Sequence, residues 1–123
     1  MSQNQHATID MQAYEELQSL MSDEQPEFFI ELLQGFIEES QEGLDKIQSA
    51  LAAGDPQGVE RPAHSTKSSS AHLGATLMSN LCRLLQEQGR AGDLSQAPPQ
   101  VEQLAAEFAL VKTFVEGKIR EIS

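Results

Sequence analysis

The sequence lacks the features expected of membrane, secreted and nucleic-acid-binding proteins. It has a single cysteine among 123 residues, which excludes a disulfide within the chain, and it has no tryptophan. No run of about eighteen apolar residues occurs, so we expect no membrane-spanning helix and no membrane partner. Eight lysines and arginines stand against nineteen aspartates and glutamates, which gives a formal net charge of −11. Because nucleic acid binds basic surfaces, this acidic balance argues against a nucleic-acid partner.

The beginning of the chain also lacks the pattern of a secretion signal. Residues 1–8, MSQNQHAT, are polar and have neither the basic nor the apolar region of a signal peptide. We interpret them as a disordered leader, followed by a single domain over residues 9–123. The length is enough for one hydrophobic core, and we expect a cytoplasmic protein. Cys82 is then expected to be a small helix-packing residue.

Apolar residues recur at helical spacing through most of the chain. The predicted helices span residues 9–21, 26–53, 76–88 and 99–122, and a further one ends near residue 72. Thr8 or Asp10 caps the short first helix, and Pro62 either kinks the helix that contains it or delays its start. Residues 89–99 are predicted to be a polar loop. Four substantial helices with short connections predict an all-α fold, an up-down-up-down antiparallel four-helix bundle with a short extra N-terminal helix.

Two stretches of this pattern decide what faces the core. In the second predicted helix, Phe28 and Ile37 widen the apolar stripe, and we interpret them as core residues. The alternative is an exposed apolar patch on which a partner docks. The first helix is expected to turn one side inward, with Ile9, Ala13, Leu17 and Leu20.

The most informative stretch is AHSTKSSSAHLGA, residues 63–75. On a helix, His64 lies within the polar face, and Lys67 is its neighbour one turn further on. Ser68 and Ala71 are small, so no bulky side chain crowds the imidazole. A neutral imidazole is a good nucleophile, and a nearby ammonium stabilises a phosphoryl group. This arrangement suits phosphoryl relay to a second protein, although a lone surface histidine is more often only a solvated residue.

These residues resemble the signature of histidine-containing phosphotransfer (HPt) domains, roughly A-H-x-L-K-G-S-S-x-x-x-G-A. The matching positions are Ala63, His64, Lys67, Ser69, Ser70, Gly74 and Ala75. Similarity continues at Leu81-Cys82, residues 89–94 and Glu107-Phe108, so it covers most of the chain. The resemblance implies that His64 is phosphorylated and that Lys67 stabilises the phosphate. His72 lacks this lysine context and is not the expected site.

Two positions depart from the family signature. Thr66 stands where the family has leucine, and Ser68 stands where it has glycine. The Ser68 hydroxyl could contact the phosphoryl group or obstruct it. These departures leave open a second function, in which a phosphotransfer-impaired HPt-like module binds and sequesters a response regulator or another protein.

The turn at residues 73–75 predicts which residues lie beside His64. If the flanking helices are antiparallel, positions about ten residues on either side of the turn lie abreast, which pairs His64 with residues 84–88. Gln86 is therefore a candidate to hydrogen-bond an imidazole nitrogen and select its tautomer, as a polar residue often does in the family. A solvated glutamine is an equally acceptable interpretation. The predicted docking face around His64 consists of Glu60, Arg61, Ser68 and Ala71.

The resemblance implies a stand-alone phosphorelay carrier and not an enzyme. It would accept a phosphoryl group on His64 from a receiver-domain aspartate and pass it to another receiver domain. The expected partners are the receiver domains of a hybrid sensor kinase and a response regulator, which would hold the catalytic Mg²⁺. We expect a monomer without a cofactor of its own. A metal site on Glu60 and His64, spaced i, i+4, is a third possibility, but no second histidine shares that face, so no metal is expected.

Overall fold

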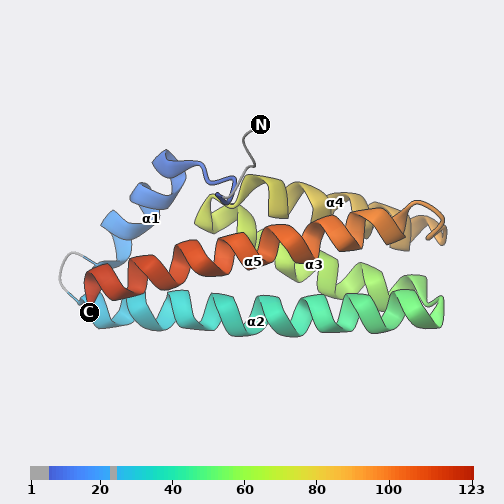
Figure 1. Cartoon of the computed structure of the whole chain (residues 1–123), viewed down its shortest axis with the longest axis horizontal. Helices are drawn as coiled ribbons and strands as arrows, with labels where there is room; N and C mark the ends of the chain where they lie inside the picture. Colours follow the sequence, from blue (N-terminus) through green and yellow to red (C-terminus); the bar gives the residue numbers. More distant parts are fainter. Residues whose placement is uncertain (1–5, 23–24) are drawn as a thin grey trace.

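The computed structural model describes residues 6–22 and 25–123, and these residues form five α-helices (Figure 1). The helices are α1 (Met11–Ser22), α2 (Pro26–Ala53), α3 (Pro56–Leu73), α4 (Thr76–Ala91) and α5 (Ala97–Ile122). Both α2 and α4 contact α3 and α5, so these four helices close an up-down-up-down bundle, and α1 packs against α2 and α3. The predicted all-α bundle with a short extra N-terminal helix is confirmed. No helix in the described ranges has the length and apolar character needed to cross a membrane.

Proline and glycine set the ends of the helices. Pro26 and Pro56 occupy the first positions of α2 and α3, where a backbone N–H would have no partner within the helix. Gly74 ends α3 with a φ of 91°, and its N–H bonds to carbonyls of the last turn. The helix is continuous across Pro62, so it begins at Pro56 and its start is not delayed.

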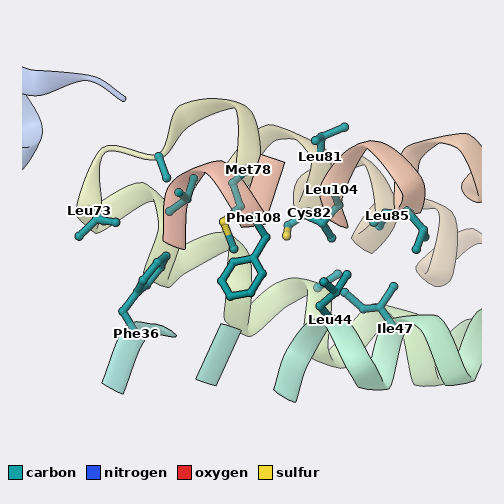
Figure 2. Close-up of a cluster of buried hydrophobic side chains, with 14 of the residues drawn as sticks. Phe36, Leu44, Ile47, Leu73, Met78, Leu81, Cys82, Leu85, Leu104 and Phe108 are labelled. Atoms are coloured by element: carbon teal, nitrogen blue, oxygen red, sulfur yellow. The ribbon is translucent and has the colours of Figure 1, made fainter. Parts of the chain in front are cut away.

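The core lies between α2, α3, α4 and α5, whose apolar stripes meet along the bundle axis (Figure 2). The side chains labelled there are Phe36, Leu44, Ile47, Leu73, Met78, Leu81, Cys82, Leu85, Leu104 and Phe108. Cys82 is a free cysteine and is fully buried among them, as its predicted packing role requires. This burial removes apolar surface from water, which is the main source of stability for such a bundle.

The first helix is fixed by one side chain that the apolar pattern did not single out. The Tyr14 ring is fully buried and lies 5.9 Å from Phe29 and 5.2 Å from Phe114, measured between ring centroids. The prediction that Leu20 faces inward is wrong, because this side chain is 82% exposed. The Tyr14 side chain reaches past α2 to Phe114 of α5, and Leu20 lies outside this contact.

The segment before α1 is tied across the turn between α3 and α4. The N–H of Thr8 donates to Glu107 Oε2 at 2.7 Å, and the N–H of Asp10 donates to the Gly74 carbonyl at 2.7 Å. Asp10 Oδ1 also accepts from the N–H of Gln12 at 3.1 Å, which confirms Asp10 as a cap of α1. Of the predicted disordered leader, residues 1–5 lie outside the described residues, whereas Thr8 is held in place. These bonds anchor the end of the α3–α4 pair.

Several helix boundaries and the core assignment of Phe28 differ from the predictions. α1 begins at Met11 and not at residue 9, α4 continues to Ala91 instead of ending near residue 88, and α5 begins at Ala97. Phe28 is 54% exposed, so the prediction of a core position for it is wrong. Ile37, in contrast, is partly buried against the core.

Candidate functional site

The expected site residues lie on α3 and α4, which pack along each other as an antiparallel pair. The buried stripe of α3 consists of Val59, Ala63, Thr66, Ser70 and Leu73. His64 lies on the opposite side of this helix and is exposed. The bundle therefore presents the imidazole at its surface.

Gln86 holds the ring from the neighbouring helix. Its side-chain Nε2 lies 2.9 Å from His64 Nδ1, and Gln86 is only 6% exposed. The alternative of a solvated glutamine is therefore wrong. With Nε2 of Gln86 donating to Nδ1, the ring proton is on the histidine Nε2; a half-turn of the amide presents its oxygen to an Nδ1–H and frees the histidine Nε2 lone pair. The contact thus couples the amide orientation to the tautomer of His64.

A second contact joins the two helices one turn away from the first. Arg90 Nε lies 3.3 Å from Glu60 Oε2, in an ion pair whose side chains are 66% and 29% exposed, respectively. Glu60 precedes His64 by four residues on α3, and Arg90 follows Gln86 by four residues on α4. Arg90 was not predicted as a site residue, because residues 89–99 were predicted to be a loop. Continuing α4 by one turn past Gln86 would have revealed it.

Both contacts border one open depression of about 460 Å³ around the imidazole. It is lined by Glu60, Arg61, His64, Ser65, Gln86 and Arg90. We call it the histidine depression. Two residues of the predicted docking face, Glu60 and Arg61, belong to it, whereas Ser68 and Ala71 do not. His72 lines a different groove, beside Phe36 and Leu73.

Lys67 lies beside the histidine depression and not inside it. It is half-buried and lines an adjacent depression of about 200 Å³ with Ala71, Asn80 and Arg83. No carboxylate in the described part of the chain pairs with its ammonium. The Lys67 carbonyl accepts a hydrogen bond from the Ser79 hydroxyl at 3.0 Å, which ties α3 to α4. Among the described residues, the ammonium therefore has no carboxylate partner that an incoming anion would have to displace.

The two departures from the HPt signature have local structural explanations. Ser68 Oγ points back along α3 toward the His64 carbonyl at 3.5 Å, and so along the helix rather than over the ring. Thr66 is buried, and a Cβ added to Gly43 of α2 would lie 2.5 Å from its Oγ1. A close approach between α2 and α3 therefore fills the space at Thr66.

Gly89 explains how α4 comes so near to the start of α3. A Cβ added at this position would lie 2.6 Å from the Pro56 carbonyl oxygen and 2.9 Å from the Glu60 backbone nitrogen. Only glycine allows the two backbones to approach this closely. Gly89 therefore continues the helix, and does not end it as predicted, because its missing side chain makes room for α3.

The titratable residues do not gather into a metal site. In the described ranges, no group of three or more histidine, cysteine, aspartate or glutamate side chains is placed to hold a metal ion. Glu60, one of the two residues considered as ligands, is paired with Arg90. The geometry instead presents an open surface imidazole with a buried amide on one ring nitrogen and cationic groups on either side.

These features define a helical bundle built around an exposed, oriented histidine, and comparison with known proteins gives the same class. The Hpt domain family model matches residues 31–114. The crystal structure of histidine-containing phosphotransfer protein B from Pseudomonas aeruginosa PAO1 is similar, with 35% sequence identity and a TM-score of 0.85. The match covers 93% of this chain and 96% of that chain. No curated protein sequence matches.

The chain belongs to the Hpt domain family, because the family model covers most of it and a solved phosphotransfer protein matches nearly its whole length. It is thus a phosphotransfer domain of the kind used in two-component phosphorelays, and not a conventional enzyme.

Proposed function

We propose that the protein carries a phosphoryl group on Nε2 of His64, which it receives from the aspartyl phosphate of one receiver domain and passes to the aspartate of another. The observation that supports this proposal most directly is the exposed imidazole whose Nδ1 lies 2.9 Å from the buried Gln86 amide. This contact leaves Nε2 as the ring nitrogen that faces an incoming partner. The donor and acceptor would be receiver domains of a hybrid sensor kinase and a response regulator.

The transfer step is a nucleophilic displacement at phosphorus. The Nε2 lone pair forms the bond to phosphorus while the bond from phosphorus to the aspartate oxygen breaks, and that electron pair leaves with the carboxylate. In the reactive tautomer the ring proton is on Nδ1, and this N–H donates a hydrogen bond to the amide oxygen of Gln86 after a half-turn of the amide. Transfer to the second receiver runs the same step in reverse.

The other groups around His64 have supporting roles in this proposal. The unpaired ammonium of Lys67 would contact the phosphoryl oxygens as a point charge. Glu60, Arg61, Ser68 and Ala71 would meet the receiver surface. The Mg²⁺ used in the transfer would be held by the receiver domain.

The test compares the wild type with His64→Gln and His72→Gln, each mixed with a phosphorylated receiver domain. We expect an acid-labile, alkali-stable phosphoryl label on the wild type and on His72→Gln, and no label on His64→Gln. His72 is a matched control because it is also exposed and also lies on α3. Circular dichroism should be unchanged in both variants.

Label that survives in His64→Gln would refute the assignment of this residue. If all three proteins bind the receiver and none is labelled, the protein instead sequesters the receiver without accepting its phosphoryl group.

A further inference from the structure

Two contacts between α3 and α4 lie one helical turn apart and border the same depression. His64 and Gln86 form the first, at 2.9 Å, and Glu60 and Arg90 form the second, at 3.3 Å. Because one turn of helix advances about 5.4 Å, the Arg90 guanidinium is within reach of the imidazole by side-chain rotation alone. Nothing in the phosphoryl transfer described above requires this second contact.

The ion pair is built so that it can open. Arg90 is 66% exposed, and a guanidinium at the surface moves freely on its long stem. Glu60 is 29% exposed and therefore more firmly held against the helices. An ion pair this accessible to water is worth only about 0.2–1 kcal/mol. Loss of the ion pair would therefore destabilise the fold only slightly, and any larger effect is expected at the neighbouring His64.

Phosphorylation of His64 would place a stronger anion beside this pair. A phosphoryl group carries a charge of roughly −1.5 to −2 near pH 7 and has three strong acceptor oxygens, whereas the Glu60 carboxylate has one negative charge. The planar guanidinium of arginine binds two such oxygens at once. The phosphoryl group would therefore compete with Glu60 for Arg90.

We propose that Glu60 is a positioning residue that holds Arg90 while His64 is unmodified and releases it to the phosphoryl group once His64 is phosphorylated. This inference rests on His64 being the phosphorylated residue. Before transfer, Glu60 neutralises Arg90 and keeps it away from the ring. After transfer, the Arg90 guanidinium leaves the Glu60 carboxylate and binds the phosphoryl oxygens. Glu60 is then exposed to water. The exchange makes the stability of the phosphohistidine depend on a carboxylate that does not touch it.

The expected effect follows from this competition. Removing the charge of Glu60 makes Arg90 available without breaking an ion pair, so the phosphorylated form is favoured. In hydrolysis the P–N bond breaks and its electron pair leaves with the imidazole, so the phosphoryl oxygens carry less charge in a metaphosphate-like transition state than in the phosphohistidine. A guanidinium that binds the phosphohistidine more strongly than this transition state slows the step. We expect the phosphohistidine half-life of Glu60→Gln to be about 1.4- to fivefold longer than that of the wild type, the range that a surface ion pair implies.

The experiment uses phosphoramidate, a small nitrogen-bound phosphoryl donor, so that no receiver domain is needed. The wild type, Glu60→Gln, Arg90→Gln and the double variant are phosphorylated, the donor is removed, and the loss of label is followed. The matched control is Glu87→Gln, which removes the same charge from a pair with Arg83 on α4, 3.1 Å apart. We expect an unchanged half-life in the control and a shorter one in Arg90→Gln.

The double variant and a spectroscopic readout separate positioning from simple repulsion. If Glu60 acts through Arg90, then Glu60→Gln should no longer lengthen the half-life when Arg90 is already glutamine. In ¹H–¹⁵N NMR spectra of the wild type, the Arg90 Nε–H signal should shift on phosphorylation, while the Arg83 Nε–H signal should not.

The proposal would be overturned if Glu60→Gln lengthened the phosphohistidine half-life equally with Arg90 and with glutamine at position 90. An Arg90 Nε–H signal that does not shift on phosphorylation would also overturn it. If phosphoramidate labels His64 and the Arg90 signal shifts, but no phosphorylated receiver delivers its group, the relay function fails while the exchange stands.

Discussion

Two buried ionisable side chains, Cys82 and Tyr14, are kept neutral by the core. Burial raises the pKa of the Cys82 thiol from an ordinary 9.0 to about 12. Burial, with a smaller contribution from the nearby charge of Glu121, raises the pKa of Tyr14 from 10.0 to about 12. Among the described residues, no hydrogen-bond partner reaches the Tyr14 hydroxyl. Neither group can ionise in the folded protein without bringing an unsatisfied charge into the core.

These shifts predict a loss of stability at high pH. Since both folded pKa values lie above the unfolded ones, the stabilisation is complete below about pH 9 and is lost as pH rises toward 12. We expect the free energy of unfolding, measured with denaturant, to fall over this range. In Cys82→Ala the free energy of unfolding should begin to fall about one pH unit higher. In Tyr14→Phe the decrease at the high-pH end of the range should be smaller. Identical pH profiles in all three proteins would contradict this origin.

At the scale of single elements, the close packing of α4 on α3 determines the geometry of the site. Gly89 allows the backbone of α4 to lie against Pro56 and Glu60, and this approach sets both the Gln86 contact and the Arg90 ion pair. The helix pair therefore acts as one unit. A change that separates the two helices would reach the imidazole without touching it.

Gly89→Ala tests this coupling. The added Cβ would overlap backbone atoms of α3 that cannot rotate away, so we expect destabilisation by about 1–3 kcal/mol and weaker phosphorylation of His64. Gly35→Ala is the matched control, because it lies within α2 and a Cβ there would meet no atom within 4 Å. This control should gain up to about 1 kcal/mol from helix propensity. Equal effects of the two substitutions in thermal unfolding would refute the packing argument.

The elements were largely predictable because helical periodicity and the prolines and glycines at helix ends are local signals. The bounds of α2 were predicted to the residue, and the antiparallel turn at residues 73–75 was enough to bring Gln86 to His64. The end of α4 was not predictable in this way. Gly89 has the local signature of a helix end, and only the contact with α3 shows that it is a packing position. Arg90 was missed for the same reason.

Side-chain exposure was the least predictable property. Phe28 and Phe29 are adjacent and chemically identical, yet the first is 54% exposed and the second fully buried. The difference depends on where α1 and α5 lie, and the position of α1 depends in turn on Tyr14. A sequence pattern gives the width of an apolar face but not the neighbour that covers it.

For the whole molecule, charge is divided unevenly between the site and the rest. Residues 56–91 contain Arg61, Lys67, Arg83 and Arg90 against Glu60 and Glu87, a formal charge of +2 with histidine neutral. The total of −11 leaves −13 for the remaining residues. The α3–α4 pair is thus mildly basic within a strongly acidic chain. Beyond about 8 Å at physiological ionic strength, charges are largely screened, so an approaching partner senses the local surface first.

This division predicts the sign of the salt effect on phosphoryl transfer. If the net charge governed encounter with an acidic receiver domain, added salt would screen repulsion and speed the transfer. Because the local face is basic, we expect the second-order rate constant of phosphoryl transfer to fall several-fold between low and high salt, measured on samples quenched at successive times. Arg83→Gln should flatten the dependence, whereas Lys112→Gln on α5 should not. A rate that rises with salt would show that the net charge dominates.

All the groups assigned to phosphoryl transfer lie between residues 60 and 90, within the two helices that Gly74 joins and the N-terminal segment anchors. The remaining helices supply apolar surface to this pair and no reactive group. The reactive groups are therefore confined to the α3–α4 hairpin. A different helical bundle whose apolar faces matched this hairpin would be expected to present the same groups.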